Sequence, residues 1–213
     1  MWTERNDKVP AIEYLWFALY TFAGFSAELI QGILIYDLPS GIGNLVTAFL
    51  WFMISGCLLI LAKKKFGYLI LPEKAKLSIN NHLLMLVCVG VTIIITTIGF
   101  GGLKPFVEFQ GESQGNIFAY ICRLLYYLAE SLLILLTIVF GQRFSDIKFT
   151  LPKQIPAGGI VLALTWGIIH FFLQGISGGI YTMVFSLIAG QIYLLAKKDT
   201  RWSYLYISIA FIL

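Results

Sequence analysis

The chain has 213 residues, of which 59% are hydrophobic and only 12% are charged, and its mean hydropathy is +0.85. A soluble domain carries roughly twice that share of charged residues. The composition therefore excludes a soluble globular domain and predicts an integral membrane protein. Because the apolar segments follow one another with short connections, we expect one membrane domain over residues 1–213. The net charge of +4 does not predict nucleic-acid binding, since lysine and arginine gather at the segment ends.

Six apolar segments are long enough to cross a bilayer, which takes about 20 helical residues. In chain order they cover residues 14–36, 44–62, 82–103, 117–140, 156–174 and 178–196. Residues 104–116 are expected to form a loop whose charges are mainly acidic. A last apolar segment, residues 203–213, reaches about 16 Å as a helix, or roughly half of the membrane. The sequence thus predicts an all-α, polytopic transmembrane helix bundle of six full spans and a short C-terminal half span.

Lysine and arginine alternate between the two sides of this bundle. There are two before the first segment, and then none, five, one, three, none and three in the successive connections. Cytoplasmic connections carry an excess of these residues. The alternation predicts a cytoplasmic N-terminus.

The fourth segment carries two charged side chains, Arg123 and Glu130, within an apolar run. A charge at the centre of a membrane helix costs roughly 2.5 to 3.5 kcal/mol on insertion scales, so such residues usually face a bundle interior or a wet cavity. Seven positions place the two on one helix face, about two turns apart. Tyr126 and Tyr127 lie between them. We expect these residues to form a polar seam that points into the protein.

Other polar residues fall at similar depths. Glu28 in the first segment and His170 in the fifth are expected in the outer half of the membrane with Arg123, and Glu130 nearer the midplane. Such groups could neutralise one another, with Arg123 as the counter-charge of Glu28 or Glu130. This cluster could serve to hold the helices together, or it could form a functional polar site, and the sequence leaves both interpretations open.

The fifth segment has Trp166, His170 and Gln174 at intervals of four residues, so they are predicted to lie on one helix face. A metal site is not expected, because the other histidine, His82, falls near the opposite side of the membrane. No cofactor is evident from the sequence.

A family resemblance rests on four features in order. They are Glu130, then FGQRF at residues 140–144, TWGIIHFF at 165–172 and GQIYLLAKKD at 190–199. In this order residues 120–213 resemble the membrane-embedded CAAX-protease and bacteriocin-processing family, whose members are compact helix bundles with EExxxR, FxxxH and HxxxN motifs. The resemblance assigns Glu130 to the first glutamate, His170 to the histidine and Trp166 to the aromatic residue.

The resemblance implies that Glu130 and His170 are catalytic and activate a water for attack on a peptide carbonyl. It implies a peptide or lipidated peptide as substrate and a bacterial plasma membrane as location. Residues expected to line or support the cavity are Arg123, Glu28, Tyr127, Trp166 and Gln174.

Three motif positions depart from the family pattern. Ser131 stands for the second glutamate, Leu135 stands for the arginine, and residues 203–213 contain no histidine or asparagine. We therefore expect a degenerate or inactive relative of these proteases. The alternative is a non-catalytic membrane carrier, a ligand-binding subunit or a partner of another membrane protein. Both interpretations place the chain in the lipid bilayer.

Overall fold

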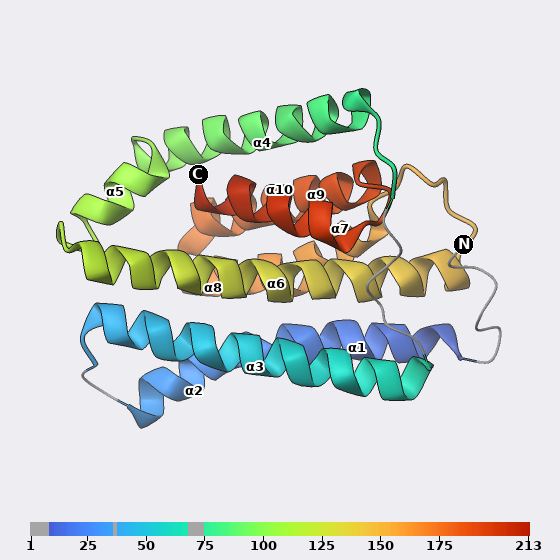
Figure 1. Cartoon of the computed structure of the whole chain (residues 1–213), viewed down its shortest axis with the longest axis horizontal. Coiled ribbons are helices and arrows are strands. Elements are labelled where there is room, and N and C mark those ends of the chain that lie inside the picture. Colours follow the sequence, from blue (N-terminus) through green and yellow to red (C-terminus); the bar gives the residue numbers. More distant parts are fainter. Residues whose placement is uncertain (1–8, 36–37, 68–74) are drawn as a thin grey trace.

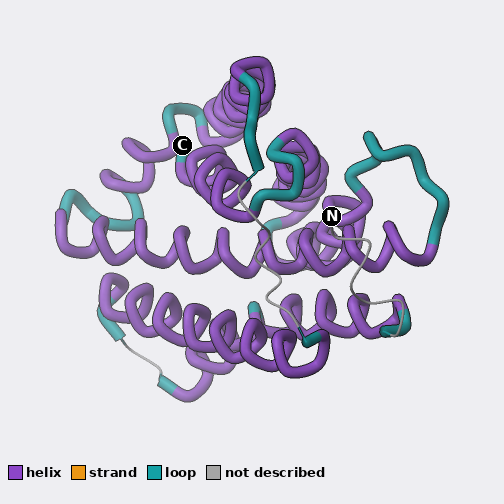
Figure 2. The backbone as a smooth tube through the Cα atoms, turned by 45° about the vertical axis from the view of Figure 1, so that its right-hand side comes forward, coloured by secondary structure: helices purple, strands orange, loops and turns teal. Residues whose placement is uncertain are grey.

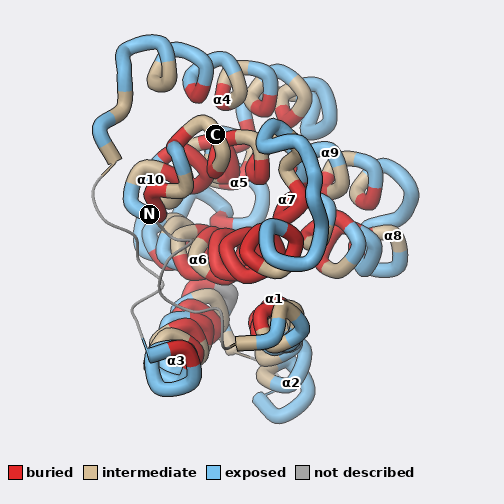
Figure 3. The backbone as a smooth tube through the Cα atoms, turned by 90° about the vertical axis from the view of Figure 1, so that its right-hand side faces the viewer, coloured by how far each residue is buried: buried red, intermediate tan, exposed pale blue. Residues whose placement is uncertain are grey.

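One long helix, α6 (Ile117–Lys148), lies at the centre of the computed structural model, which describes residues 9–35, 38–67 and 75–213. The side chain of Asn116 caps its first turn by accepting hydrogen bonds from the backbone N–H groups of Phe118 and Ala119. Helices α1 and α3 pack along one side of α6, and α7 and α10 pack along the other (Figures 1 and 3). The bundle is thus organised around α6.

The first predicted span is two helices, α1 (Ala11–Gly24) and α2 (Ser26–Leu34), which meet at Phe25. The chain then continues in α3 (Ser40–Phe66), which is four residues longer at its start than the predicted second span. Helix α3 ends where Gly67 takes a φ of +72°, a conformation that glycine adopts without strain.

The third predicted span is α4 (Ile79–Phe100), and Ser78 caps it with a capping box. The loop predicted after it is wrong in part, because residues 104–110 form a short helix, α5 (Lys104–Gln110). Pro105 stands in the first turn of α5, where its missing N–H costs no hydrogen bond. Helix α5 turns two charged residues inward, Lys104 and Glu108.

The fifth predicted span is divided into α7 (Ala157–Leu162), a π-helical turn η1 (Ala163–Gly167) and α8 (Ile168–Leu173). It joins α9 (Gly175–Leu195) at a sharp turn, so α9 begins three residues before the predicted sixth span. The tube view shows the helices and, in teal, the described loops and turns between them (Figure 2).

The short last segment is a helix, α10 (Thr200–Ile212), packed against α6, α4 and α9. Its start is held by Asp199, which accepts hydrogen bonds from the backbone of Arg201 and of Ala75. Because Ser203, Ile207 and Ala210 are fully buried, this helix belongs to the protein core.

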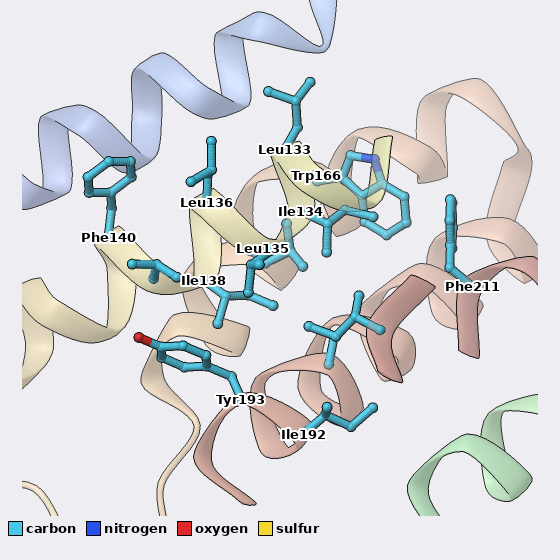
Figure 4. Packing of buried hydrophobic residues seen from close by; sticks show 14 of the residues in the cluster. Leu133, Ile134, Leu135, Leu136, Ile138, Phe140, Trp166, Ile192, Tyr193 and Phe211 are labelled. Atoms are coloured by element: carbon cyan, nitrogen blue, oxygen red, sulfur yellow. The ribbon is translucent and has the colours of Figure 1, made fainter. Parts of the chain in front are cut away.

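The all-α prediction is confirmed over the described residues, where every regular element is helical. Within the described ranges, five helical stretches are long and apolar enough to cross a membrane, which indicates a multi-pass membrane protein. They cover residues 11–34, 41–66, 79–110, 117–148 and 175–195. Residues 157–173 form a sixth, shorter apolar stretch. The apolar core lies around the middle of α6, where Leu133 to Phe140 meet Trp166, Ile192 and Phe211 (Figure 4).

Candidate functional site

A cavity of about 1130 Å³ opens among the ends of several helices beside the first half of α6. Helices α2, α4, α5, α8 and α9 supply its walls, and α10 contributes Phe211. The structure places all seven of the predicted site residues on this wall: Glu28, Arg123, Tyr127, Glu130, Trp166, His170 and Gln174. The polar seam of α6 therefore faces the same space as the polar face of α8.

Glu130 and His170 are linked through Trp166. The indole Nε1 of Trp166 donates a hydrogen bond to Glu130 Oε1 at 3.3 Å, and the His170 ring lies 4.4 Å from the Trp166 ring. His170 Nδ1 lies 2.7 Å from the backbone oxygen of Trp166. A carbonyl oxygen only accepts, so Nδ1 is the protonated nitrogen and Nε2 keeps its lone pair.

The local backbone explains why both aromatic rings reach the cavity. Trp166 lies in the π-helical turn, where the helix carries one residue more than α geometry allows. Gly167 leaves room for α9, because a Cβ there would lie 3.1 Å from the side chain of Met183. The hydroxyl of Thr182 in α9 donates to the Gly167 carbonyl at 3.2 Å. These contacts fix the turn that positions Trp166 and His170.

Arg123 pairs with a residue that the sequence analysis did not choose. Its Nε lies 3.1 Å from Glu108 Oε2 in α5, and it also donates to Tyr127 and Asn44. The expectation that Glu28 or Glu130 is its ion-pair partner is wrong, because α5 folds back and brings Glu108 nearer. Tyr127 donates to the other oxygen of Glu108 at 2.6 Å, which completes a buried network.

Glu28 meets the seam through Tyr126, whose hydroxyl donates to Glu28 Oε1 at 2.9 Å. This contact joins α2 to α6 at the edge of the cavity. Gln174 lies at the turn between α8 and α9 and is exposed. The predicted face of Trp166, His170 and Gln174 is therefore present, with its last member at the rim.

Lys104, like Glu108, is a functional-site candidate that sequence reasoning missed. It is 4% exposed, and its Nζ donates to the backbone oxygen of Phe211 at 2.7 Å. The ammonium group also lies 4.1 Å from the ring centre of Tyr127 and 4.5 Å from that of Phe211. The available signal for a helix with both charges on one face was the spacing of four residues between Lys104 and Glu108, with Pro105 as a possible first-turn proline directly after Lys104.

The positions that would complete the protease motifs lie away from the cavity. Ser131 is fully buried and its hydroxyl has no hydrogen-bond partner among the described residues. Leu135 packs in the apolar core. On α10, the residue that reaches the cavity is the apolar Phe211. The wall thus holds one glutamate and one histidine of the expected set.

In the described part of the chain, no three side chains of histidine, cysteine, aspartate or glutamate gather closely enough to hold a metal ion. His82 contacts Tyr206 and Trp202 on α10 instead of the cavity. Comparison with protein-family models, with curated proteins and with solved structures finds no match to this chain. The candidate site is consequently defined by its own geometry.

Proposed function

We propose that the chain is a degenerate relative of the CAAX-protease and bacteriocin-processing family that binds a ligand in an intramembrane cavity without hydrolysing it. In this proposal it crosses a bacterial plasma membrane with six spans and a partial seventh, and its N-terminus is cytoplasmic. The observation that carries the proposal is the cavity wall itself, which contains Glu130, Trp166 and His170 but neither Ser131 nor Leu135, the residues at the positions of the second glutamate and the arginine.

The chemistry of that wall supports binding more than hydrolysis. Peptide hydrolysis needs a base for the attacking water and also donors that stabilise the oxyanion. Glu130 and the free Nε2 of His170 are suitable bases. Arg123 is paired with Glu108, and Lys104 donates to the Phe211 carbonyl, so both cations already serve acceptors within the protein.

Thermal unfolding in detergent tests whether the cavity is kept for a ligand. Residues that serve function are often neutral or costly for stability. We expect Glu130→Gln and His170→Ala to change the melting temperature by less than about 3 °C, which is about 1 kcal/mol for a chain of this size. Leu133→Ala, in the apolar core of the same helix, should lower it clearly and serves as the control. A large fall in both site variants would show that the polar wall is structural.

Peptidase activity is the second candidate, because the His170 tautomer leaves Nε2 able to accept a proton. It can be tested with fluorescence-quenched peptides, with and without a prenyl group, on protein in lipid nanodiscs. We expect no cleavage above the level of Glu130→Gln. Cleavage that this variant abolishes would replace the binding proposal with an active protease.

A further inference from the structure

We propose that the ligand of this cavity is an amphiphilic organic cation, such as a lipophilic amine or a quaternary ammonium or phosphonium compound. This inference rests on the proposed function, that the cavity binds a ligand, and adds the ligand's charge and chemical class. It is carried by an excess of carboxylates, by the partners that the cavity's own cations already have, and by the aromatic wall.

The cavity wall carries more carboxylates than cationic side chains. Among the described residues, four carboxylates line it, Glu28, Glu108, Glu112 and Glu130, against two cations, Lys104 and Arg123. Because a low-dielectric site favours a neutral total, such a wall favours a positively charged occupant over a negatively charged one.

Both cations are already engaged within the protein. Arg123 forms its ion pair with Glu108 and donates to Asn44, which leaves it part of an internal network. Lys104 donates to the Phe211 carbonyl and is almost completely enclosed. An anionic ligand would find only the remaining N–H groups of these two cations, whose charge is already shared with acceptors of the protein.

Two carboxylates, in contrast, keep an oxygen without a partner. Glu130 is 6% exposed, its Oε1 accepts from Trp166, and its Oε2 has no hydrogen-bond partner among the described residues. Glu28 uses Oε1 for Tyr126 and forms no ion pair with a described residue. No ion pair to Glu130 forms among the described residues, and a buried carboxylate is stabilised by a direct partner of opposite charge. A cationic ligand would supply that direct partner at Glu130.

The wall also offers aromatic faces that suit a cation. Lys104 is an internal example, because its ammonium group lies over the rings of Tyr127 and Phe211. Other aromatic side chains line the same space: Phe22, Phe25, Phe100, Tyr126, Trp166 and Tyr181. The attraction between a cation and an aromatic ring is stronger where the ring is desolvated. Leu29, Ile98 and Leu173 complete an apolar lining, so the preferred cation is one with apolar substituents.

The test uses two ions of nearly equal size and opposite charge. Purified protein in nanodiscs is titrated with tetraphenylphosphonium and, separately, with tetraphenylborate, and protein-free nanodiscs correct for partition into lipid. We expect saturable binding of the phosphonium ion at one site, and at least about tenfold weaker binding of the borate ion, which is about 1.4 kcal/mol. Equal affinity for both ions would overturn the charge argument.

Variants locate the binding within the cavity. Glu130→Gln keeps the shape and the hydrogen bond from Trp166 but removes the charge, and we expect it to weaken phosphonium binding about tenfold. Glu28→Gln should weaken it less, because Glu28 lies at the more exposed edge. Glu13→Gln is the matched control, because Glu13 pairs with Lys65 outside the cavity and its loss should leave binding unchanged. Full phosphonium affinity in Glu130→Gln, with its melting temperature retained, would reject the proposal.

The outcomes separate this inference from the proposed function. Saturable binding of tetraphenylborate that Lys104→Met abolishes would overturn the cation class while leaving a ligand-binding cavity. Binding of neither ion would also overturn the cation class, and the unfolding test of Glu130→Gln and His170→Ala would still decide whether the cavity serves a ligand.

Discussion

The two halves of α6 differ in what surrounds them, although both are strongly apolar in sequence. In the first half, the buried Tyr126 and Tyr127 alternate with exposed residues such as Ile121 and Leu125. In the second half, every residue from 133 to 143 is buried. One half therefore lines a polar cavity, and the other is the centre of the core. Hydropathy thus places a helix in the membrane, whereas the neighbouring helices decide which of its faces are buried.

The largest expected loss of stability comes from a substitution in the core half of α6, the half that contains residues 133–143. Leu136 is 2% exposed, so Leu136→Ala should lower the free energy of unfolding by about 3 to 4 kcal/mol through the cavity that it leaves. Leu125→Ala, in the first half of the same helix, removes the same atoms from an exposed position and should cost less than about 1 kcal/mol. Unfolding in mixed detergent micelles measures both. Similar losses would mean that the two halves of α6 are equally packed.

The next largest loss of stability is expected in the first half of α6, which lines the polar cavity. Arg123→Ala leaves Glu108 buried without its ion pair, and we expect a loss of about 3 kcal/mol. Replacing Glu108 with glutamine in the same chain removes the uncompensated charge. The double variant should then be more stable than the sum of the two single losses predicts, by at least about 0.5 kcal/mol. Additive losses would show that the two side chains are independent.

A smaller effect is expected where the core half of α6 meets α7. A Cβ on Gly158 would lie 2.2 Å from the backbone oxygen of Ile138, and backbone cannot move aside as a side chain can. Gly158→Ala should therefore cost about 2 kcal/mol, within the usual range for overpacking. Gly90→Ala in α4 is the control, because nothing lies within 4 Å of its Cβ position. There the substitution should be neutral or stabilising, since alanine favours a helix.

The smallest effect is a pH dependence outside both halves, at the start of α10. Burial alone would raise the pKa of Asp199, but hydrogen bonds from Arg201 and from the backbone of Ala75 hold it below its ordinary value. The stabilisation from a lowered pKa is complete above the unfolded value, near pH 4, and is lost as the pH falls through the folded value. We expect the melting temperature to fall by about 2 °C more in the wild type than in Asp199→Asn between pH 5 and pH 3. Parallel curves for the two proteins would contradict this.

Much of the fold could be predicted from the sequence, because a long apolar segment in a membrane protein has few alternatives to a helix. The segments around residues 82–103 and 117–140 agree with α4 and α6, apart from their ends. The division of the fifth segment could not be predicted, since nothing in ALTWG distinguishes a π turn from an α turn. The burial of α10 was also beyond a length argument, because it depends on packing against α6.

The candidate site could be predicted in part for a related reason. A charge inside an apolar run is conspicuous, so Glu28, Arg123 and Glu130 were found. Lys104 and Glu108 stand next to a polar stretch and were assigned to a loop. Their burial comes from the return of α5 over the end of α6, which is a tertiary contact. The wrong partner for Arg123 followed directly from that assignment.

The π turn at Ala163–Gly167 makes the length of the chain at that point a determinant of the site. A relative that lacked one residue between 163 and 167 could close the turn into an ordinary α-helix and keep α8 in nearly the same orientation, because the π turn holds one extra residue. A relative that kept all five residues but formed an α turn would instead rotate everything after it in α8 by about 100° about the helix axis, and His170 would leave the cavity wall. A change of this turn from π to α at constant length is therefore a route by which such a protein could gain or lose its site without any substitution among the polar residues.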